Sequence, residues 1–249
     1  MMLLKIENLI KAFGGFRATD GVDFSVMKGS LCSLIGPNGA GKTTLFNQIT
    51  GYLVPDSGRV AFRGEEITGL HPYEISRKGI TRAFQIINIF PRLTVMESVQ
   101  LAILAKRGLT LKCFASARRM AREEAMAVLE TVGLADRSAL LARELSHGDQ
   151  RVLELALALA GEPELLLLDE PMAGMSPFER VKVTELIQRI HRDRKITVLF
   201  CEHDMDMVFG ISERVTVLHQ GRVIAEGKPE EIKKNEEVHM VYLGQSSVI

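Results

Sequence analysis

The chain has 249 residues, of which 46% are hydrophobic and 25% are charged, and its 31 Lys and Arg side chains balance its 31 Asp and Glu side chains. This length suits one α/β domain or a core with an inserted lobe, and the composition is ordinary for a soluble globular protein. The balanced charge gives no electrostatic reason to expect nucleic acid as a partner. No apolar run approaches the roughly 18 residues of a membrane span, and charges interrupt the apolar N-terminus, so we expect neither a transmembrane helix nor a signal peptide.

The first third of the chain is predicted to form strands separated by short turns that contain Gly or Asp. The expected strands cover residues 3–10, 22–26, 31–35, 58–62 and 80–85. The third of these strands runs directly into a glycine-rich loop and then into the apolar-periodic segment TLFNQITGYL, which predicts a strand–loop–helix unit.

The middle of the chain changes to helical periodicity. From about residue 94 to 145, apolar residues recur every three or four positions, which predicts a helical lobe inserted into the α/β core. The elements expected after the lobe are a helix at 148–160, a strand at 164–170, a helix at 177–194, a strand at 196–201, a short helix after His203, a hairpin turning at 220–221 and two short C-terminal helices. The predicted division of the single domain 1–249 is a core at 1–90 and 155–228, a helical subdomain at 91–154 and C-terminal helices at 229–249.

The glycine-rich loop, Gly36-Pro-Asn-Gly-Ala-Gly-Lys-Thr, matches the phosphate-binding pattern G-x-x-x-x-G-K-[ST]. Glycines let successive backbone N–H groups point at phosphate oxygens, and the following helix adds its positive N-terminal end. We expect Lys42 to reach the β- and γ-phosphates and Thr43 to bind Mg²⁺. The predicted nucleotide-binding residues of this motif are Gly36, Pro37, Asn38, Gly39, Ala40, Gly41, Lys42, Thr43 and Thr44. The motif alone leaves kinases, GTPases and other ATPases open.

A run of four leucines that ends in Asp169 and Glu170 is the second candidate motif. A buried strand of this kind can place Asp169 beside the Mg²⁺ ion and leave Glu170 facing the γ-phosphate, where it would orient and deprotonate a water molecule. A general base contributes about 10²–10⁴-fold in rate, so we expect loss of Glu170 to cripple turnover and to spare binding.

The third motif, Leu145-Ser146-His147-Gly148-Asp149, opens a predicted helix and resembles the LSGGQ signature of ABC cassettes. Four further resemblances follow the family order: Phe13 for the aromatic that stacks on adenine, Gln85 for the Q-loop, residues 173–177 for the D-loop and His203 for the switch histidine. By this resemblance, which covers essentially the whole chain, the protein is identified as a member of the ABC ATPase family.

The resemblance implies an α/β P-loop NTPase fold, with a RecA-like core, an N-terminal antiparallel β subdomain and an inserted α-helical subdomain. It also implies that two cassettes pack head to tail, so that each ATP lies between the phosphate loop of one copy and the signature of the other. Ser146 and the backbone of Gly148 would contact the γ-phosphate bound by the partner copy. Gln85 would join Thr43 and Asp169 as a Mg²⁺ ligand. The implied catalytic residues are Glu170, His203, Gln85 and Lys42.

The partners that the resemblance implies are a second cassette, either identical or a paralogue, and integral membrane permease subunits that receive the motion through the Gln85 region and the helical lobe. A solute-binding protein would be an indirect partner. The expected location is the cytoplasmic face of the inner membrane, where the protein would be peripheral.

Finer features resemble the ATP-binding subunits of branched-chain amino acid importers: GITRAFQIINIFPRLTVMESV, the long helical lobe after it, EPMAGMSP and VHMVYLG. Urea, amide and aromatic-acid importers share these features, and the lipopolysaccharide-export ATPase shares several, although the segment between Gln85 and Ser146 is too long for it. A non-transport ABC ATPase acting on DNA or ribosomes is an alternative that usually has two cassettes or a coiled coil. A regulatory module without turnover is a further alternative, against which Lys42, Asp169, Glu170 and His203 argue.

The signature departs from the family pattern at two positions, where His147 replaces a glycine and Asp149 replaces a glutamine. These changes are either tolerated variation at a rim position or, for His147, a group that titrates near neutrality and makes ATPase activity sensitive to pH. Phe13 replaces the more common tyrosine. It is either the adenine stacker or a core residue, and Phe16 competes with it for the stacking role.

Overall fold

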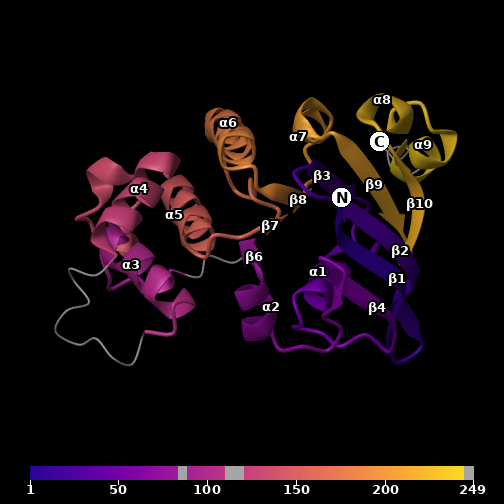
Figure 1. Ribbon diagram of the computed structural model, residues 1–249. Helices are drawn as coiled ribbons and strands as arrows, with labels where there is room; N and C mark the ends of the chain where they lie inside the picture. Colours follow the sequence, from indigo (N-terminus) through magenta and orange to yellow (C-terminus); the bar gives the residue numbers. More distant parts are fainter. Residues whose placement is uncertain (84–88, 110–120, 244–249) are drawn as a thin grey trace.

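Two β-sheets with a helix between them, and a group of helices to one side, make up the computed structural model, which describes residues 1–83, 89–109 and 121–243 (Figure 1). The first sheet is antiparallel, has four strands and has the order β2-β1-β4-β5. The second sheet has six strands in the order β10-β9-β3-β8-β7-β6. This is the α/β fold with an N-terminal antiparallel subdomain and a helical subdomain that the motifs led us to expect.

The strands of the antiparallel sheet are β1 (Met2–Phe13), β2 (Phe16–Met27), β4 (Ser57–Phe62) and β5 (Glu65–Glu66). The first two are longer than predicted, because residues 11–21 continue the hairpin instead of forming turns. Pairing between β1 and β2 runs from Met2 to Phe13 with several register shifts, and such bulges accommodate Gly21 at a φ of +72°. The only turn between these strands lies at residues 14–15.

The strands of the six-stranded sheet are β3 (Leu31–Ile35), β6 (Ile80–Ala83), β7 (Leu165–Asp169), β8 (Thr197–Cys201), β9 (Arg214–His219) and β10 (Arg222–Gly227). Five of them are parallel, and β10 pairs antiparallel with β9 through a hairpin at the predicted turn. Every residue of β3, β7 and β8 is buried. Parallel strands that are covered on both faces have this continuous apolar character.

Each face of the six-stranded sheet packs against its own hydrophobic core. Along β7, Leu165 and Leu167 pack with the antiparallel sheet and α1, whereas Leu166 and Leu168 pack with the helices on the other face. This alternation follows from the two-residue period of a strand. The phosphate-loop helix α1 (Lys42–Ile49) is buried between the two sheets through Leu45, Phe46 and Ile49.

The helices outside the sheets are α2 (Pro72–Lys78), α3 (Val95–Lys106), α4 (Arg122–Val132), α5 (His147–Ala160), α6 (Pro177–Arg194), α7 (Met205–Ile211), α8 (Pro229–Ile232) and α9 (Glu236–Leu243), with short 3₁₀ turns η1 (Ala135–Arg137) and η2 (Ala142–Glu144). The packing of α3, α4 and α5 on one another forms the lobe at the left of Figure 1. None of the helices in the described ranges is long and apolar enough to cross a membrane.

Two features of the helices differ from the sequence prediction. Helix α2 was not predicted, although His71, with Pro72 at the first position and Glu74 at the third, forms a capping box that starts it. Helix α5 is unbroken across the predicted subdomain limit at 154/155. It begins at the signature in the lobe and ends beside β6 of the core, so one rigid element links the two. The predicted subdomain limits themselves stay a prediction.

We expect Gly58→Ala to destabilise the protein strongly, and Gly64→Ala to serve as its matched control. Both glycines have almost the same positive φ, +84° and +82°, but a Cβ at Gly58 would lie 2.2 Å from the Asn8 carbonyl oxygen, whereas none of the described atoms lies within 4 Å of a Cβ at Gly64. The left-handed strain of about 1–2 kcal/mol is common to both variants. Chemical denaturation should give an additional loss of about 1–3 kcal/mol for Gly58→Ala alone; equal losses would contradict the packing argument.

Candidate nucleotide site

The phosphate loop follows the buried strand β3 and ends at the first residue of α1, at the carboxyl edge of the parallel sheet. Ligands of open α/β sheets bind at this edge. Asn38, Gly39 and Thr43 are exposed there, and the first turn of α1 contains no acidic residue that would repel an anion. The N–H groups at the start of this helix therefore face a position suited to phosphate.

Close backbone packing fixes the path of the loop. A Cβ at Gly36 would lie 2.1 Å from the Leu218 carbonyl oxygen, and a Cβ at Gly41 would lie 2.1 Å from the Ala18 carbonyl oxygen. The amide of Gly221, in the β9–β10 turn, donates to the Ala40 carbonyl oxygen at 2.9 Å. Strand β2 and the β9–β10 hairpin thus hold the loop from the outside, and side chains at these two glycines would push it away.

Lys42 is buried, and its ammonium donates to the carbonyl oxygens of Gly36 and Pro37 at 2.6 and 3.1 Å. Burial lowers the pKa of Lys42, and the nearby Cys201, Glu170 and Asp169 oppose this shift. The lysine therefore lies within electrostatic reach of both carboxylates that the sequence analysis placed at the site.

Asp169 is buried at the end of β7 and forms an ion pair with Arg82 of β6, with 2.5 Å between Oδ2 and Nη2. Arg82 also donates to Asn47 Oδ1 at 2.6 Å and lies over the Phe46 ring. Sequence analysis missed Arg82. It precedes the predicted Q-loop by three positions, and only the pairing of β6 with β7 brings it to the carboxylate.

Glu170 and His203 meet at the same edge, with 3.1 Å between Glu170 Oε1 and His203 Nε2. Glu170 has a φ of +49°, an unusual conformation for a residue other than glycine, and its amide donates to the Cys201 carbonyl oxygen at 3.0 Å. Glu170 and His203, which were each predicted to be catalytic, are therefore in contact.

A second residue that sequence analysis missed is Glu202, which is buried beside this pair. Its Oε1 accepts from the Met172 amide at 2.9 Å and its Oε2 accepts from the His203 amide at 3.0 Å. The carboxylate thereby joins the loop after Glu170 to the loop that holds His203. The available sequence signal for Glu202 was its place between an apolar strand and His203. This pattern does not show whether the Glu202 carboxylate is buried.

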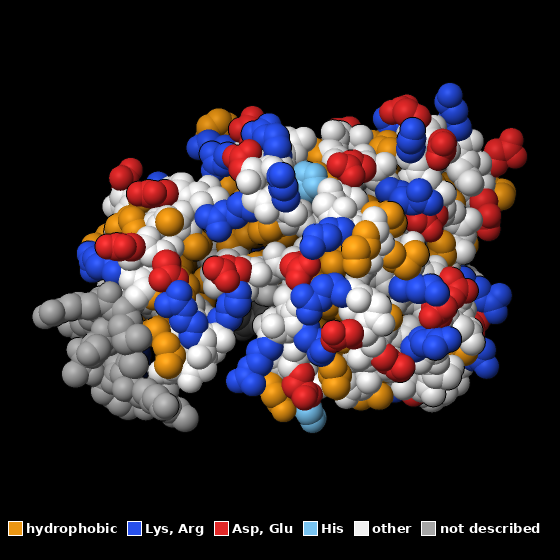
Figure 2. Space-filling view, viewed as in Figure 1, with side chains coloured by type: hydrophobic (Ala, Val, Ile, Leu, Met, Phe, Trp, Pro, Cys, Tyr) orange, Lys and Arg blue, Asp and Glu red, His pale blue; other side chains and the backbone are white. Residues whose placement is uncertain are grey.

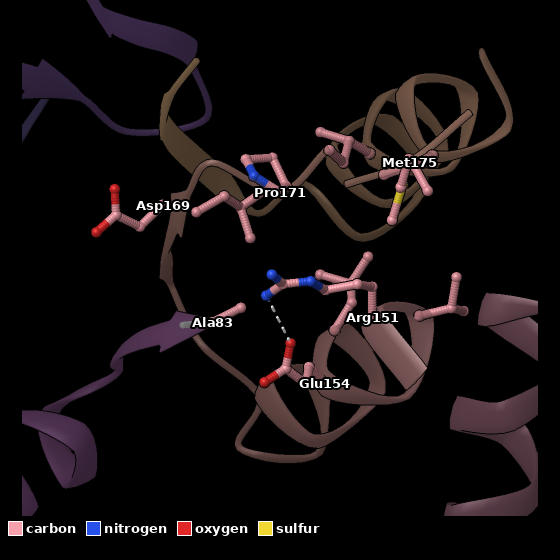
Figure 3. A pocket seen from close by; sticks show the side chains of 11 residues that line it. Ala83, Arg151, Glu154, Asp169, Pro171 and Met175 are labelled. Atoms are coloured by element: carbon pink, nitrogen blue, oxygen red, sulfur yellow. Dashed lines mark hydrogen bonds and ion pairs between the residues drawn. The ribbon is translucent and has the colours of Figure 1, made fainter. Parts of the chain in front are cut away.

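Figure 3 shows a small pocket between α5 and the end of β7, beside Asp169 and Pro171. Arg151 points into it from α5 and forms an ion pair with Glu154 at 3.2 Å, both side chains being buried. The signature helix thus carries a buried ion pair next to the acidic strand. The surface that Figure 2 shows has basic and acidic side chains intermingled.

The signature lies at the N-terminus of α5, where Ser146 is the N-cap and is exposed to solvent. Gly148 is buried against Glu179 of α6, whose carboxylate a Cβ would approach to 2.5 Å. His147 packs beside Gly174 in the predicted D-loop, with its Cε1 3.3 Å from the place of a Cβ. The signature and the D-loop of one subunit are therefore in contact, and Ser146 faces outward.

Of two further predicted site residues, one is an exposed aromatic and the other lies outside the described ranges. Phe13, at the end of β1, is 51% exposed and Phe16, paired across the hairpin, is 57% exposed. The alternative that Phe13 is a core residue is therefore wrong, and both phenylalanines stay candidates for adenine stacking. Gln85 lies outside the described residues, so its predicted roles are untested.

The residues at this edge fit the groups that the motif implies. The Thr43 hydroxyl and the Asp169 carboxylate are oxygen donors, the type that Mg²⁺ prefers. Gly39, with a φ of +79° and open space around it, leaves room for a phosphate to approach the backbone. The fold and the loop define the class: a P-loop ATPase cassette.

Comparison with known proteins identifies the family to which the chain belongs. Residues 19–173 match the family described as ABC transporter, and residues 222–247 match the family described as branched-chain amino acid ATP-binding cassette transporter. The chain is 40% identical to the high-affinity branched-chain amino acid transport ATP-binding protein LivG of Salmonella typhimurium, over 98% of each chain. The chain belongs to the ABC transporter ATP-binding family and is an ATPase, as the motifs indicated.

Solved structures agree with this assignment. An ATP-binding cassette of an ABC transporter in its ADP conformation has a TM-score of 0.84 and 32% identity, over 98% of this chain and 99% of that one. A dimeric cassette in a post-hydrolysis state bound to ADP and Pi has a TM-score of 0.78 and 26% identity, over 91% of this chain and 99% of that one.

We predict that Lys42→Ala weakens ATP binding about 10- to 100-fold, because a hydrogen bond to a charged group is worth about 1.5–3 kcal/mol. Isothermal titration calorimetry with ATP would measure the change. Lys234→Ala, which removes an exposed lysine of the C-terminal region, is the matched control. Unaltered affinity in Lys42→Ala would refute its contact with phosphate.

Proposed function

We propose that this chain is the ATP-hydrolysing subunit of an importer of branched-chain or other amino acids, and that it works as a dimer around two ATP molecules. The observation that carries the substrate class is the 40% identity to LivG over 98% of both chains, together with the match of residues 222–247 to the branched-chain amino acid family. A urea, amide or aromatic-acid importer is the second candidate, since those families share the same sequence features.

The nucleotide would be held by the phosphate loop. The backbone N–H groups from Asn38 to Thr44, which include the start of α1, bind the phosphates. Lys42 exchanges its contacts with the Gly36 and Pro37 carbonyl oxygens for phosphate oxygens. Phe13 or Phe16 stacks on the adenine from the tip of the β1–β2 hairpin. Thr43, Asp169 and Gln85 would hold Mg²⁺, which neutralises phosphate charge when it is bound.

Glu170 acts as the general base. Its carboxylate contacts His203 at 3.1 Å, so the histidine can orient the carboxylate and a water molecule together. Glu202 supports this arrangement, because it anchors the backbone of both loops. The ion pair with Arg82 keeps the carboxylate of Asp169, the residue before Glu170, in place.

The exposed signature supports dimer formation. Ser146 can contact a nucleotide bound by another copy only if it is accessible. It is exposed at a helix N-terminus, a position that favours an anion. A second copy would bring the γ-phosphate of its ATP to this helix. The partner is an identical chain or a paralogue, and permease subunits would bind the complex at the cytoplasmic side of the membrane and receive the motion of the helical lobe.

We expect Glu170→Gln to reduce ATP hydrolysis about 10²–10⁴-fold and to accumulate an ATP-bound dimer, because the base is lost while the binding groups stay. Size-exclusion chromatography with excess ATP would show the dimer, and Lys42→Ala/Glu170→Gln would serve as the control that cannot bind ATP tightly. A variant that binds ATP tightly and stays monomeric would show that the proposed dimer is wrong.

The substrate class can be tested in membrane vesicles that contain the chain with the permeases encoded beside its gene, supplied with the neighbouring solute-binding protein. We expect ATP-dependent uptake of radiolabelled leucine, which Glu170→Gln abolishes. Uptake of urea or acetamide in place of leucine would reject the amino acid assignment and favour the second candidate.

A further inference from the structure

Asp149 holds the signature serine through both parts of its hydroxyl group. Ser146 Oγ donates its proton to Asp149 Oδ2 at 2.6 Å, and the same oxygen accepts from the Asp149 amide at 3.2 Å. The hydroxyl therefore has its proton committed within its own subunit. A phosphate oxygen is an acceptor, so the serine must turn this proton away from Asp149 before it can donate to phosphate.

Arg137, the last residue of η1, occupies the other side of the same carboxylate. Its guanidinium forms an ion pair with Asp149 Oδ1, whereas Ser146 donates to Asp149 Oδ2, so each residue contacts one of the two carboxylate oxygens. The pair lines the same groove as Ser146 and Gly148, and the Arg137 side chain is 47% exposed there. The other charged groups of this groove have partners of their own: Glu179 accepts from Ser176, and Lys182 lies over the Phe178 ring.

The carboxylate creates a difficulty for the proposed function. A second copy would bring a γ-phosphate to Ser146, which places two anions side by side at an interface where water is excluded and repulsion is strengthened. A free carboxylate would also hold the serine proton more firmly, because hydrogen bonds to a charged acceptor are the stronger ones. Both effects oppose binding, and both diminish when a guanidinium neutralises the carboxylate.

We propose that Arg137 is a positioning residue of the composite ATP site: by pairing with Asp149 it neutralises the carboxylate, so that Ser146 can donate to the γ-phosphate of the ATP held by a second copy of the chain. This inference rests on the proposed dimer. It also accounts for the aspartate at a position where the family signature has an uncharged glutamine, since the charge has its counter-ion on η1.

A purely mechanical role for the ion pair gives a different result. If the pair only tethers η1 to α5, then Asp149→Gln and Arg137→Ala break the same tether and cost the same. If Arg137 compensates charge, Arg137→Ala is harmful only while Asp149 is present, and Asp149→Gln removes the need for it. The two mutations must then be strongly non-additive.

The test uses the Glu170→Gln variant and measures the dissociation constant of the dimer at saturating ATP by analytical ultracentrifugation. An exposed ion pair contributes about threefold at each site, so we expect Arg137→Ala to raise this dissociation constant about tenfold in a dimer with two sites. Asp149→Gln/Arg137→Ala should return to within about twofold of the parent, and Arg137→Lys should recover most of the loss. Arg143→Ala, an exposed arginine of the neighbouring η2, is the matched control.

ADP binding to each monomeric variant checks that its phosphate loop is intact, because Arg137 acts on the partner's nucleotide. A parent that forms a dimer while Arg137→Ala behaves identically would overturn this inference and leave the proposed function standing. Equal losses in Asp149→Gln and Arg137→Ala would also overturn it. A parent that forms no dimer would overturn this inference together with the proposed dimer of identical chains.

Discussion

The close contact between the phosphate loop and two backbone carbonyl groups is the constraint on which the rest of the site depends. Gly36 and Gly41 leave no room for a Cβ, because the carbonyl oxygens of Leu218 and Ala18 lie where it would be. Strand β2, from the first sheet, and the β9–β10 hairpin, which adjoins β3 in the second, therefore both support one loop. The antiparallel sheet thus supports the loop that is predicted to bind phosphate.

The carboxyl edge of the parallel sheet gathers groups from the ends of three strands into one buried network. Arg82, Asp169 and Glu202 leave β6, β7 and β8 respectively and are each held by a hydrogen bond or an ion pair. Such groups are stable in an apolar interior only when they are paired. The network fixes the loops that carry Glu170 and His203, and it explains how these two side chains stay in contact at the rim while they remain accessible to solvent.

One rigid helix joins this edge to the face that a second copy would occupy. Helix α5 starts at the exposed Ser146 and ends beside β6, and its buried Arg151 and Glu154 lie next to Asp169. A force on the signature can therefore reach the catalytic strand without crossing a flexible joint. The contact of His147 with Gly174 adds a second link between the same parts.

Sequence alone was sufficient for the family, for the strands β3, β7 and β8, and for the residues of the phosphate loop, because these depend on local patterns: a glycine loop of fixed spacing and apolar runs of strand length. It also named Glu170 and His203 as catalytic candidates, His203 through the family resemblance, but their contact came from the structure. The limits of β1 and β2 were not predicted, since hairpin pairing overrode residues that normally form turns. Helix α2 was not predicted either, because it is short and its start signal is a capping box with His71 at the N-cap. Arg82, Glu202 and Arg137 were decided by tertiary structure. Each is an ordinary charged residue in the sequence, and each contacts a residue of a distant segment, which is Asp169, Met172 and Asp149 respectively. No short-range pattern encodes such a contact.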